Sequence, residues 1–245
     1  MKRRLLILGG TGEAAMLARH LAGRADFDIV SSLAGRVAAP SLPTGAVRVG
    51  GFGGVDGLAA YLMAEGIDAV VDATHPFAAR MSWNAAEACR RRRVPLLTFV
   101  RPAWQPQAND RWRPVADMAA AASLCRGRVF LTVGRQELAP FAAVDAWFLI
   151  RMIDPPDEPL PTRHGLLLAR GPFALGDEID LMRIHAIDLV VSKNSGGPAT
   201  YAKIEAARAL GLPVVMVERP ACPATDEAGS LEAVVAWLDR PHHTP

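Results

Sequence analysis

The chain has few cysteines, little net charge and no long hydrophobic run, and each shortage excludes a class of protein. Its 245 residues include three cysteines, Cys89, Cys125 and Cys222, without Cys-x-x-Cys spacing. Their number and spacing predict reduced thiols that form neither a disulfide framework nor a metal site. A net charge of +2 gives no argument for nucleic acid as a partner. No uninterrupted apolar run reaches the roughly 18 residues that span a bilayer, and the early first strand leaves no room for a signal peptide. We therefore expect a soluble cytoplasmic protein without a membrane partner.

Short apolar strands alternate with amphipathic helices along the whole chain. The helical segments carry apolar residues at i, i+3, i+4 and i+7, as in residues 14–21 and 231–238, which gives each helix one buried stripe. This alternation predicts βαβ units with largely parallel sheets that helices cover on both faces. The ten predicted strands are 5–8, 28–33, 46–49, 69–72, 95–100, 128–133, 147–152, 166–169, 189–192 and 213–217.

Ten strands are too many for one small sheet, so we expect two lobes. The predicted fold is α/β, with two Rossmann-like doubly wound lobes and an interdomain cleft. A stretch rich in Pro, Gln and Asn, residues 101–114, is predicted to be an irregular connection, followed by a helix over 115–125. We place the boundary so that residues 1–126 form the first domain and residues 127–245 the second.

A glycine turn follows the first strand and leads directly into a helix. Residues 10–15 read G-x-G-x-x-A. Small residues let the backbone approach a dinucleotide pyrophosphate, which the amide groups of the helix N-terminus then bind. The alternative is an ordinary tight turn in which Glu13 interacts with the helix dipole. The predicted cofactor contacts are Gly9, Gly10, Thr11, Gly12, Glu13 and Ala14.

The second strand ends without the acidic residue that would bind a ribose 2′-hydroxyl. Ser31, Ser32 and Arg36 lie there instead. Hydroxyl groups and a guanidinium favour a 2′-phosphate through charge-assisted hydrogen bonds, so this segment predicts NADP(H) rather than NAD(H). The alternative is a pair of loop serines and a solvated arginine.

Three further segments of the first half have both a structural and a functional interpretation. The glycines of residues 50–54 form either a flexible turn before a helix from Val55 or a loop close to a flat ligand. In DATHPFA, Thr74 and Pro76 are typical of a helix start, whereas His75 could contact a nicotinamide amide or a substrate carboxylate. Arginines 90–93 follow a helix, lack interleaved aromatic residues and predict a solvated face.

Two loops of the second half combine glycine with basic residues. Gly134 ends one strand, and Arg135 is predicted to begin a helix. In the second loop, residues 193–197 read KNSGG, Pro198 suits a first helical position, and Lys203 follows. Such loops suit phosphate or carboxylate, and the alternative is a capped turn with surface lysines. Further positive charge in this half comes from Arg151, Arg163 and Arg170.

The motifs ILGGTGEA, SLAGR, VGGFGG, DATHPFA, FLTVGR, SKNSGG and VVMVERP occur in this order. Together they resemble the precorrin-6A reductases of cobalamin biosynthesis and their cobalt-precorrin-6A relatives, over nearly the whole chain. The family's turn reads G-G-T-x-E-A, so Gly12 occupies the variable position. The resemblance implies NADPH-dependent reduction of one carbon–carbon double bond of a macrocyclic polycarboxylate, precorrin-6A, to give precorrin-6B.

Under this interpretation the remaining site residues have the following roles. Cofactor contacts include Thr74, His75, Ser195, Gly196 and Gly197, and substrate contacts are Arg135, Lys193, Asn194 and Lys203. A general acid could be His75, Lys193, Lys203, water or a group of the substrate, and His75 and Lys193 are the predicted catalytic residues. We expect a monomer or weak oligomer without a metal. Alternative functions are a dihydrodipicolinate-type NADPH reductase of another small carboxylate and a non-catalytic NADP(H)-sensing protein.

Overall fold

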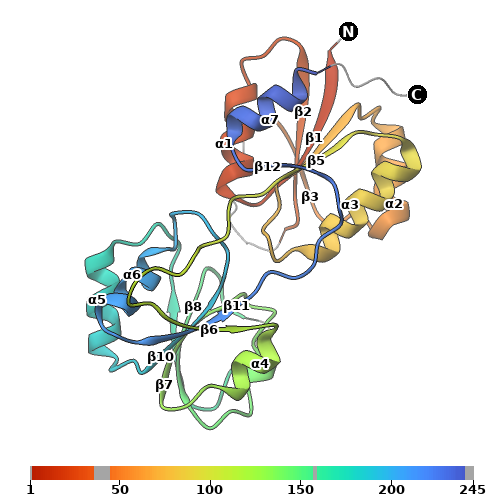
Figure 1. Cartoon of the computed structure of the whole chain (residues 1–245). Coiled ribbons are helices and arrows are strands. Elements are labelled where there is room, and N and C mark those ends of the chain that lie inside the picture. Colours follow the sequence, from red (N-terminus) through yellow and green to blue (C-terminus); the bar gives the residue numbers. More distant parts are fainter. Residues whose placement is uncertain (1, 36–44, 157–158, 241–245) are drawn as a thin grey trace. The chain divides into compact units, whose positions relative to one another are not determined.

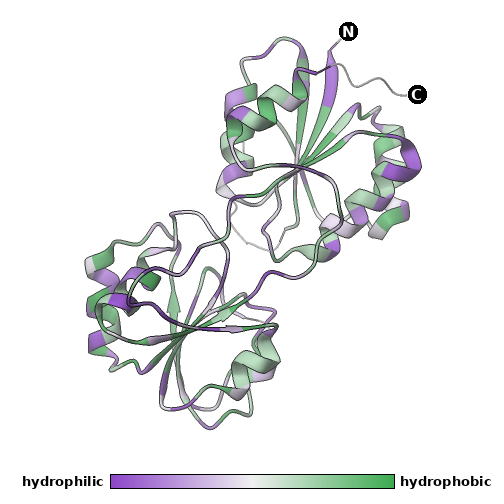
Figure 2. Ribbon diagram, in the orientation of Figure 1, coloured by the Kyte–Doolittle hydropathy of each residue, from purple (hydrophilic) through white to green (hydrophobic). Residues whose placement is uncertain are grey.

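The computed structural model describes residues 2–35, 45–156 and 159–240 and divides the chain into two compact units. Unit 1 comprises Met1–Pro102 and Pro220–Pro245, and unit 2 comprises Ala103–Arg219 (Figure 1). Each unit contains one six-stranded sheet in which all neighbouring strands are parallel. Figure 2 shows that the strands of both units are mainly hydrophobic, as expected of parallel sheets covered on both faces.

Unit 1 has the strand order β12-β5-β4-β1-β2-β3. Helices α1 and α7 pack on one face of the sheet and α2 and α3 on the other. Leu5 and Ile7 of β1 face the first pair of helices, whereas Leu6 and Leu8 face the second pair, since successive strand residues point to opposite faces. The elements are β1 (Arg3–Leu8), α1 (Gly12–Leu21), β2 (Phe27–Leu33), β3 (Ala46–Val49), α2 (Gly54–Ala64), β4 (Ala69–Asp72), α3 (Ala79–Arg92), β5 (Leu96–Phe99), β12 (Asp226–Ala228) and α7 (Leu231–Leu238).

Unit 2 has the strand order β6-β11-β10-β7-β8-β9. Helices α5 and α6 pack beside each other and cover one face of this sheet. The elements are β6 (Arg111–Val115), α4 (Met118–Ser123), β7 (Arg128–Thr132), the 3-10 helix η1 (Ala139–Phe141), β8 (Trp147–Met152), β9 (His164–Leu168), α5 (Leu175–Ile184), β10 (Leu189–Lys193), α6 (Ala202–Ala209) and β11 (Pro213–Val217).

The predicted α/β class with two Rossmann-like lobes is confirmed, and all ten predicted strands are present. The sequence analysis missed β6, which lies in the stretch predicted to be irregular, and β12, which has only three residues. Most side chains of β6 are exposed, so it lacks the apolar run by which the other strands were found. The helix predicted at Arg135 is wrong, because a turn and η1 follow β7.

The division of the chain differs from the predicted boundary after residue 126. Residues 103–126 belong to unit 2 because β6 pairs with β11 at the edge of its sheet. Residues 220–245 belong to unit 1 because β12 pairs with β5 and α7 packs on α1. The chain therefore crosses between the units twice.

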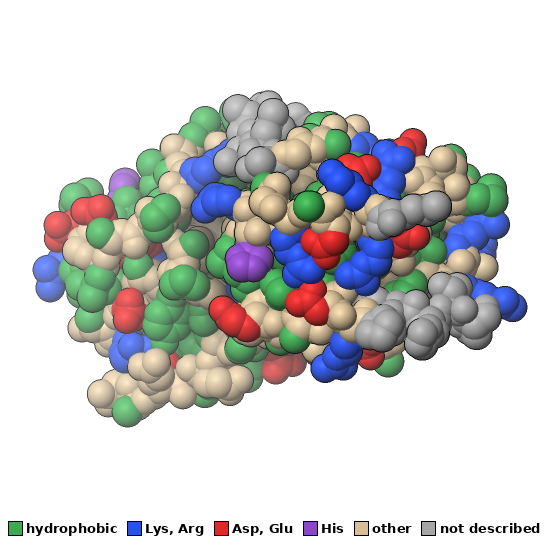
Figure 3. Space-filling model, turned by 90° about the horizontal axis from the view of Figure 1, so that it is seen from above, with side chains coloured by type: hydrophobic (Ala, Val, Ile, Leu, Met, Phe, Trp, Pro, Cys, Tyr) green, Lys and Arg blue, Asp and Glu red, His purple; other side chains and the backbone are tan. Residues whose placement is uncertain are grey.

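The mixed charges of the surface and the free thiols agree with the low net charge and the few cysteines of the sequence. On the face shown in Figure 3, Lys and Arg side chains are interspersed with Asp and Glu. Cys89 and Cys125 are buried free thiols and Cys222 is an exposed one; burial raises the pKa of Cys89 to about 12 and that of Cys125 to about 11. Among the described residues, no helix combines the length and apolar composition that crossing a membrane requires.

Candidate functional site

The glycine turn of unit 1 lies at the carboxyl end of β1, where its backbone requires two glycines. Gly10 has a φ of +107°, which side chains rarely adopt. A Cβ on Gly9 would lie 3.2 Å from the Cβ of Ala14 on α1, so the missing side chain lets strand and helix approach closely. A Cβ on Gly12 would meet nothing within 4 Å, so packing does not require glycine at this position.

Thr11 and Glu13 fix the N-terminus of α1. Thr11 is its N-cap residue: the Thr11 hydroxyl accepts a hydrogen bond from the Ala14 amide at 3.2 Å and donates one to the Ala73 carbonyl at 2.7 Å. Glu13 forms an ion pair with Arg101 at 2.6 Å, and both side chains are about four-fifths buried. The sequence analysis missed Arg101 as a partner because it assigned this residue to an irregular connection.

The end of β2 carries two buried hydroxyl groups beside an arginine that the sequence analysis did not select. Ser31 and Ser32 are 2% and 6% exposed, and the Ser31 hydroxyl has no hydrogen-bond partner among the described residues. Arg48 Nη1 donates to Ser32 Oγ at 3.3 Å. Its position near the end of β3, beside the serines on β2, is the signal that could have identified it. Arg36 lies outside the described residues.

Arg48 also holds the glycine loop that follows β3. Its guanidinium donates to the carbonyl groups of Gly50 at 2.5 Å and Gly51 at 2.7 Å. The same group lies 3.8 Å from the centre of the Phe52 ring, a cation–π geometry. Gly50, Gly53 and Gly54 have positive φ, so the loop depends on glycine for its path.

The turn after β4 contains Thr74 and His75. Asp72, only 2% exposed, accepts hydrogen bonds on Oδ1 from the Thr74 amide at 3.1 Å and the Thr74 hydroxyl at 2.7 Å. The Phe77 amide donates to Nδ1 of His75 at 3.2 Å, so the neutral ring carries its proton on Nε2. Helix α3 begins at Ala79 with Ala78 as its N-cap, so the prediction that Thr74 and Pro76 start the helix is wrong.

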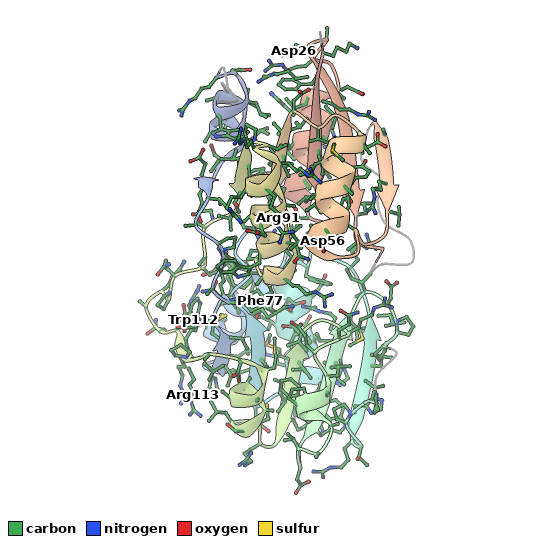
Figure 4. The ribbon with its side chains drawn as sticks, turned by 90° about the vertical axis from the view of Figure 1, so that its right-hand side faces the viewer. Asp26, Asp56, Phe77, Arg91, Trp112 and Arg113 are labelled. Atoms are coloured by element: carbon green, nitrogen blue, oxygen red, sulfur yellow. The ribbon has the colours of Figure 1, made fainter. Side chains whose placement is uncertain are left out.

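The arginine run at the end of α3 is a solvated face, as predicted, and two of its arginines also form ion pairs. The side chains of Arg90 and Arg91 are 73% and 46% exposed, and both pair with Glu87. Arg91 also pairs with Asp56 of α2 at 2.7 Å (Figure 4). The same view also labels Trp112 and Arg113, which lie on β6, the edge strand of the unit 2 sheet.

These residues of unit 1 fit a phosphorylated dinucleotide. The turn brings a capped helix N-terminus to the carboxyl edge of the sheet, where anions bind. The buried Ser31 hydroxyl, unpartnered among the described residues, and the adjacent guanidinium of Arg48 supply polar groups at the end of β2. No carboxylate lies at this end of β2, so no residue of the strand repels a 2′-phosphate there.

In unit 2, an acidic residue joins the two basic loops. Glu137 Oε2 accepts from the Gly134 amide and from Lys193 Nζ, each at 2.7 Å. The side chains of Lys193 and Glu137 are 14% and 27% exposed, so this lysine is partly buried and paired. Arg135 lies in the intervening turn and is also partly buried. The sequence analysis missed Glu137.

Lys203 is not at the surface, so the prediction that it contacts the substrate is wrong. It is 4% exposed, and its Nζ donates to the Thr200 carbonyl at 2.8 Å. Burial is the main cause that lowers the pKa of Lys203 to about 7, and Arg151 lowers it further. Arg151 is itself buried in a bidentate pair with Glu178, so it adds no exposed positive charge.

The loop of residues 194–197 follows β10. Gly196 and Gly197 have φ of +71° and +74°, as suits a glycine turn. Helix α6 begins at Ala202, so the prediction that Pro198 occupies its first position is wrong. The side chain of Asn194 exchanges two hydrogen bonds with the backbone of Trp104, at 2.8 and 3.1 Å, and Trp104 is a residue that the sequence analysis missed.

The chain is similar in sequence and in structure to known precorrin-6A reductases. The family model described as "Precorrin-6x reductase CbiJ/CobK" matches residues 4–239. The chain is 55% identical to the precorrin-6A reductase of Rhodococcus erythropolis, covering 96% of this chain and 97% of that one. It is 48% identical to the precorrin-6A reductase of Rhodobacter capsulatus, covering 99% and 98%. A solved structure titled "CobK precorrin-6A reductase" superimposes with a TM-score of 0.91 at 48% identity, covering 96% of each chain.

Proposed function

Because the chain belongs to the family of precorrin-6x reductases, we propose that it reduces precorrin-6A to precorrin-6B with NADPH in cobalamin biosynthesis. The observation that carries the proposal is the 55% identity, over nearly the full length of both chains, to a relative named precorrin-6A reductase. The same similarity favours this reaction over a dihydrodipicolinate-type reduction or a non-catalytic sensor.

The reaction saturates one carbon–carbon double bond of the macrocycle. NADPH, when bound, supplies a hydride to one ring carbon, and a proton adds to the neighbouring carbon, so that the product gains two hydrogens. The protein's contribution to such a reaction is binding, orientation and electrostatics.

In unit 1, the residues around α1 hold the dinucleotide. Gly9, Gly10 and Thr11 bring the backbone and the amide groups of the helix N-terminus to the pyrophosphate. Ser31 and Ser32, with Arg36, bind the 2′-phosphate, and Arg48 joins them because it already donates to Ser32. This arrangement selects NADPH over NADH, because a guanidinium stabilises the extra dianionic group.

Two side chains of the protein remain as proton donors, beside water and the groups of the substrate. His75 accepts from Phe77 on Nδ1, which leaves the Nε2–H as its donor. Lys193 is a second donor, held by Glu137, and with Arg135 and Asn194 it contacts the substrate carboxylates. Lys203 has no part in the proposal because its Nζ is buried. In unit 1, Thr74 is a further contact to the cofactor. In unit 2, the predicted cofactor contacts are Ser195, Gly196 and Gly197.

The test is an assay of the purified protein with precorrin-6A, with parallel arms containing cobalt-precorrin-6A and NADH. We expect loss of NADPH absorbance and a product two hydrogens heavier. A His75→Asn variant retains an acceptor for Phe77 but lacks the acidic donor, so a lower kcat would assign the proton to His75. Turnover of another carboxylate, with none of precorrin-6A, would contradict the proposal.

A further inference from the structure

The loop of residues 194–197 is held by two side chains that belong neither to β10 nor to α6. Trp104 lies two residues after the first crossing between the units, and Arg219 directly precedes the second. Both contact the loop within unit 2. We define these two residues as the loop clamp.

Trp104 binds both ends of the loop. Its backbone amide donates to Asn194 Oδ1 at 2.8 Å, and Asn194 Nδ2 donates back to the Trp104 carbonyl at 3.1 Å. Its indole Nε1 donates to the Gly197 carbonyl at 2.8 Å. The side chain is packed against Tyr201, with ring centres 5.4 Å apart, and the residue is only 8% exposed, so the indole has little freedom to move.

Arg219 binds the centre of the loop. Its Nε donates to the Asn194 carbonyl at 2.9 Å, and its Nη2 donates to the Ser195 carbonyl at 3.1 Å. In a planar trans peptide the N–H points opposite to the C=O. The bond to the Ser195 carbonyl therefore directs the Gly196 amide away from Arg219.

The loop needs such external support because its own residues supply little rigidity. Gly196 and Gly197 adopt positive φ in succession, and glycine loses more conformational freedom on ordering than any other residue. The loop clamp offsets this entropic cost in the folded protein. Trp104 or Arg219 donates a hydrogen bond to three of the four loop carbonyl groups.

We propose that Trp104 and Arg219 are positioning residues, which fix the amide groups of Gly196 and Gly197 in the orientation that binds an anion. The amides of Asn194 and Ser195 already donate to the Val217 and Lys193 carbonyl groups. The anion is a phosphate of the cofactor or a carboxylate of the macrocycle. The inference rests on the proposed function, in which this loop contacts the bound ligands. It adds two residues that act through the loop and do not touch the ligand.

The test uses the full-length variants Trp104→Phe and Arg219→Gln, each of which removes donors to the loop. Arg128→Gln is the matched control, because Arg128 is a partly buried arginine of unit 2 that donates to the His185 carbonyl and stacks on Trp147, at the amino end of β7 and away from the loop. Hydrogen exchange of the backbone amides of residues 193–197 is measured without ligand. The Kd for NADPH and the KM for precorrin-6A then distinguish the two sources of the anion.

We expect faster exchange of the loop in both clamp variants and a loss of about tenfold in affinity for one of the two ligands. The control should lower Tm without either change, and Arg219→Lys should recover part of the affinity because it restores one donor. Unchanged loop exchange, or unchanged affinity for both ligands with a lower Tm, would overturn the proposal. If wild-type protein fails to reduce precorrin-6A, the proposed function fails, whereas loop exchange and NADPH titration still decide the role of the clamp.

Discussion

The ammonium group of Lys203 lies in the interior of unit 2, near Arg151 and Glu178. Burial lowers its pKa from 10.5 to about 7, Arg151 opposes its charge, and Glu178 only partly compensates. The unfolded chain therefore binds more protons than the folded protein between these two pKa values. Stability must rise with pH across this window, by up to about 1.4 kcal/mol per pH unit, and the full cost of the buried charge is present below the folded pKa.

Lys203→Met tests this account of the buried charge. The variant lacks the titration, so wild-type stability should rise relative to the variant as the pH increases from about 7 to about 10. Urea denaturation of both proteins across this range measures the difference. The KM for precorrin-6A should change little, because only 4% of Lys203 is exposed. Parallel stability curves would show that the lysine does not titrate as described.

Arg48 gives a prediction about cofactor choice. Arg48→Gln removes the guanidinium beside Ser32 and should raise the Kd for NADPH about tenfold while changing the Kd for NADH much less. Arg24→Gln is the control, since Arg24 stacks on Phe27 and pairs with Asp26 before β2, at the opposite end of the strand. Fluorescence titration measures both constants, and equal losses for the two cofactors would refute the assignment. Arg36→Ala should behave like Arg48→Gln.

Among the elements, those that a short segment determines were predictable. The apolar runs of the central strands, the glycine turn after β1 and the stripe of α7 are local signals, and the structure confirms each element. The exposed strand β6 and the three-residue β12 depend on pairing with β11 and β5, which are distant in sequence. The same limit applies to the site: the serines of β2 were identified, whereas their neighbour Arg48 on β3 and the partner Glu137 became visible only through tertiary contacts.

The N-cap of α1 can be tested against that of α7. Thr11→Ala loses the cap to Ala14 and the bond to the Ala73 carbonyl, so it should cost about 1 to 2 kcal/mol of stability and weaken NADPH binding. Ser230→Ala loses the cap to Ala233 and the hydrogen bond to the Glu232 side chain, and it should cost about 1 kcal/mol with NADPH binding unchanged. Denaturation measures the stability of both variants, and titration measures their affinity for NADPH. Weakened NADPH binding in both variants would contradict a role of the α1 N-cap in cofactor binding.

At the scale of the whole molecule, unit 2 is one continuous segment, inserted between the two segments that make up unit 1. Residues 103–126 provide the edge strand β6 and the buried Ala121 and Ala122 of α4. No local signal in the sequence shows that residues 103–126 belong to unit 2, because proline and polar residues obscure the start of β6. The boundary predicted after residue 126 would separate β6 and α4 from the rest of unit 2.

Two fragments test this division. A fragment of residues 103–219 should unfold cooperatively, because it contains the complete sheet and the helices of unit 2. A fragment of residues 127–219 lacks β6 and α4, leaves β11 as an edge strand and should fail to form a cooperative structure. Thermal melts followed by circular dichroism compare them. Equal transitions in the two fragments would contradict the assignment of residues 103–126 to this unit.

The central claim is that the protein transfers hydride from NADPH to precorrin-6A. A single-turnover reaction with NADPH deuterated at the nicotinamide C4, followed by mass spectrometry of the product, tests it most directly. We predict one deuterium atom in each reduced macrocycle when the transferred position carries the label, and none when only the opposite face is labelled. A reduced product without deuterium from either form, or no reduced product, would contradict the claim.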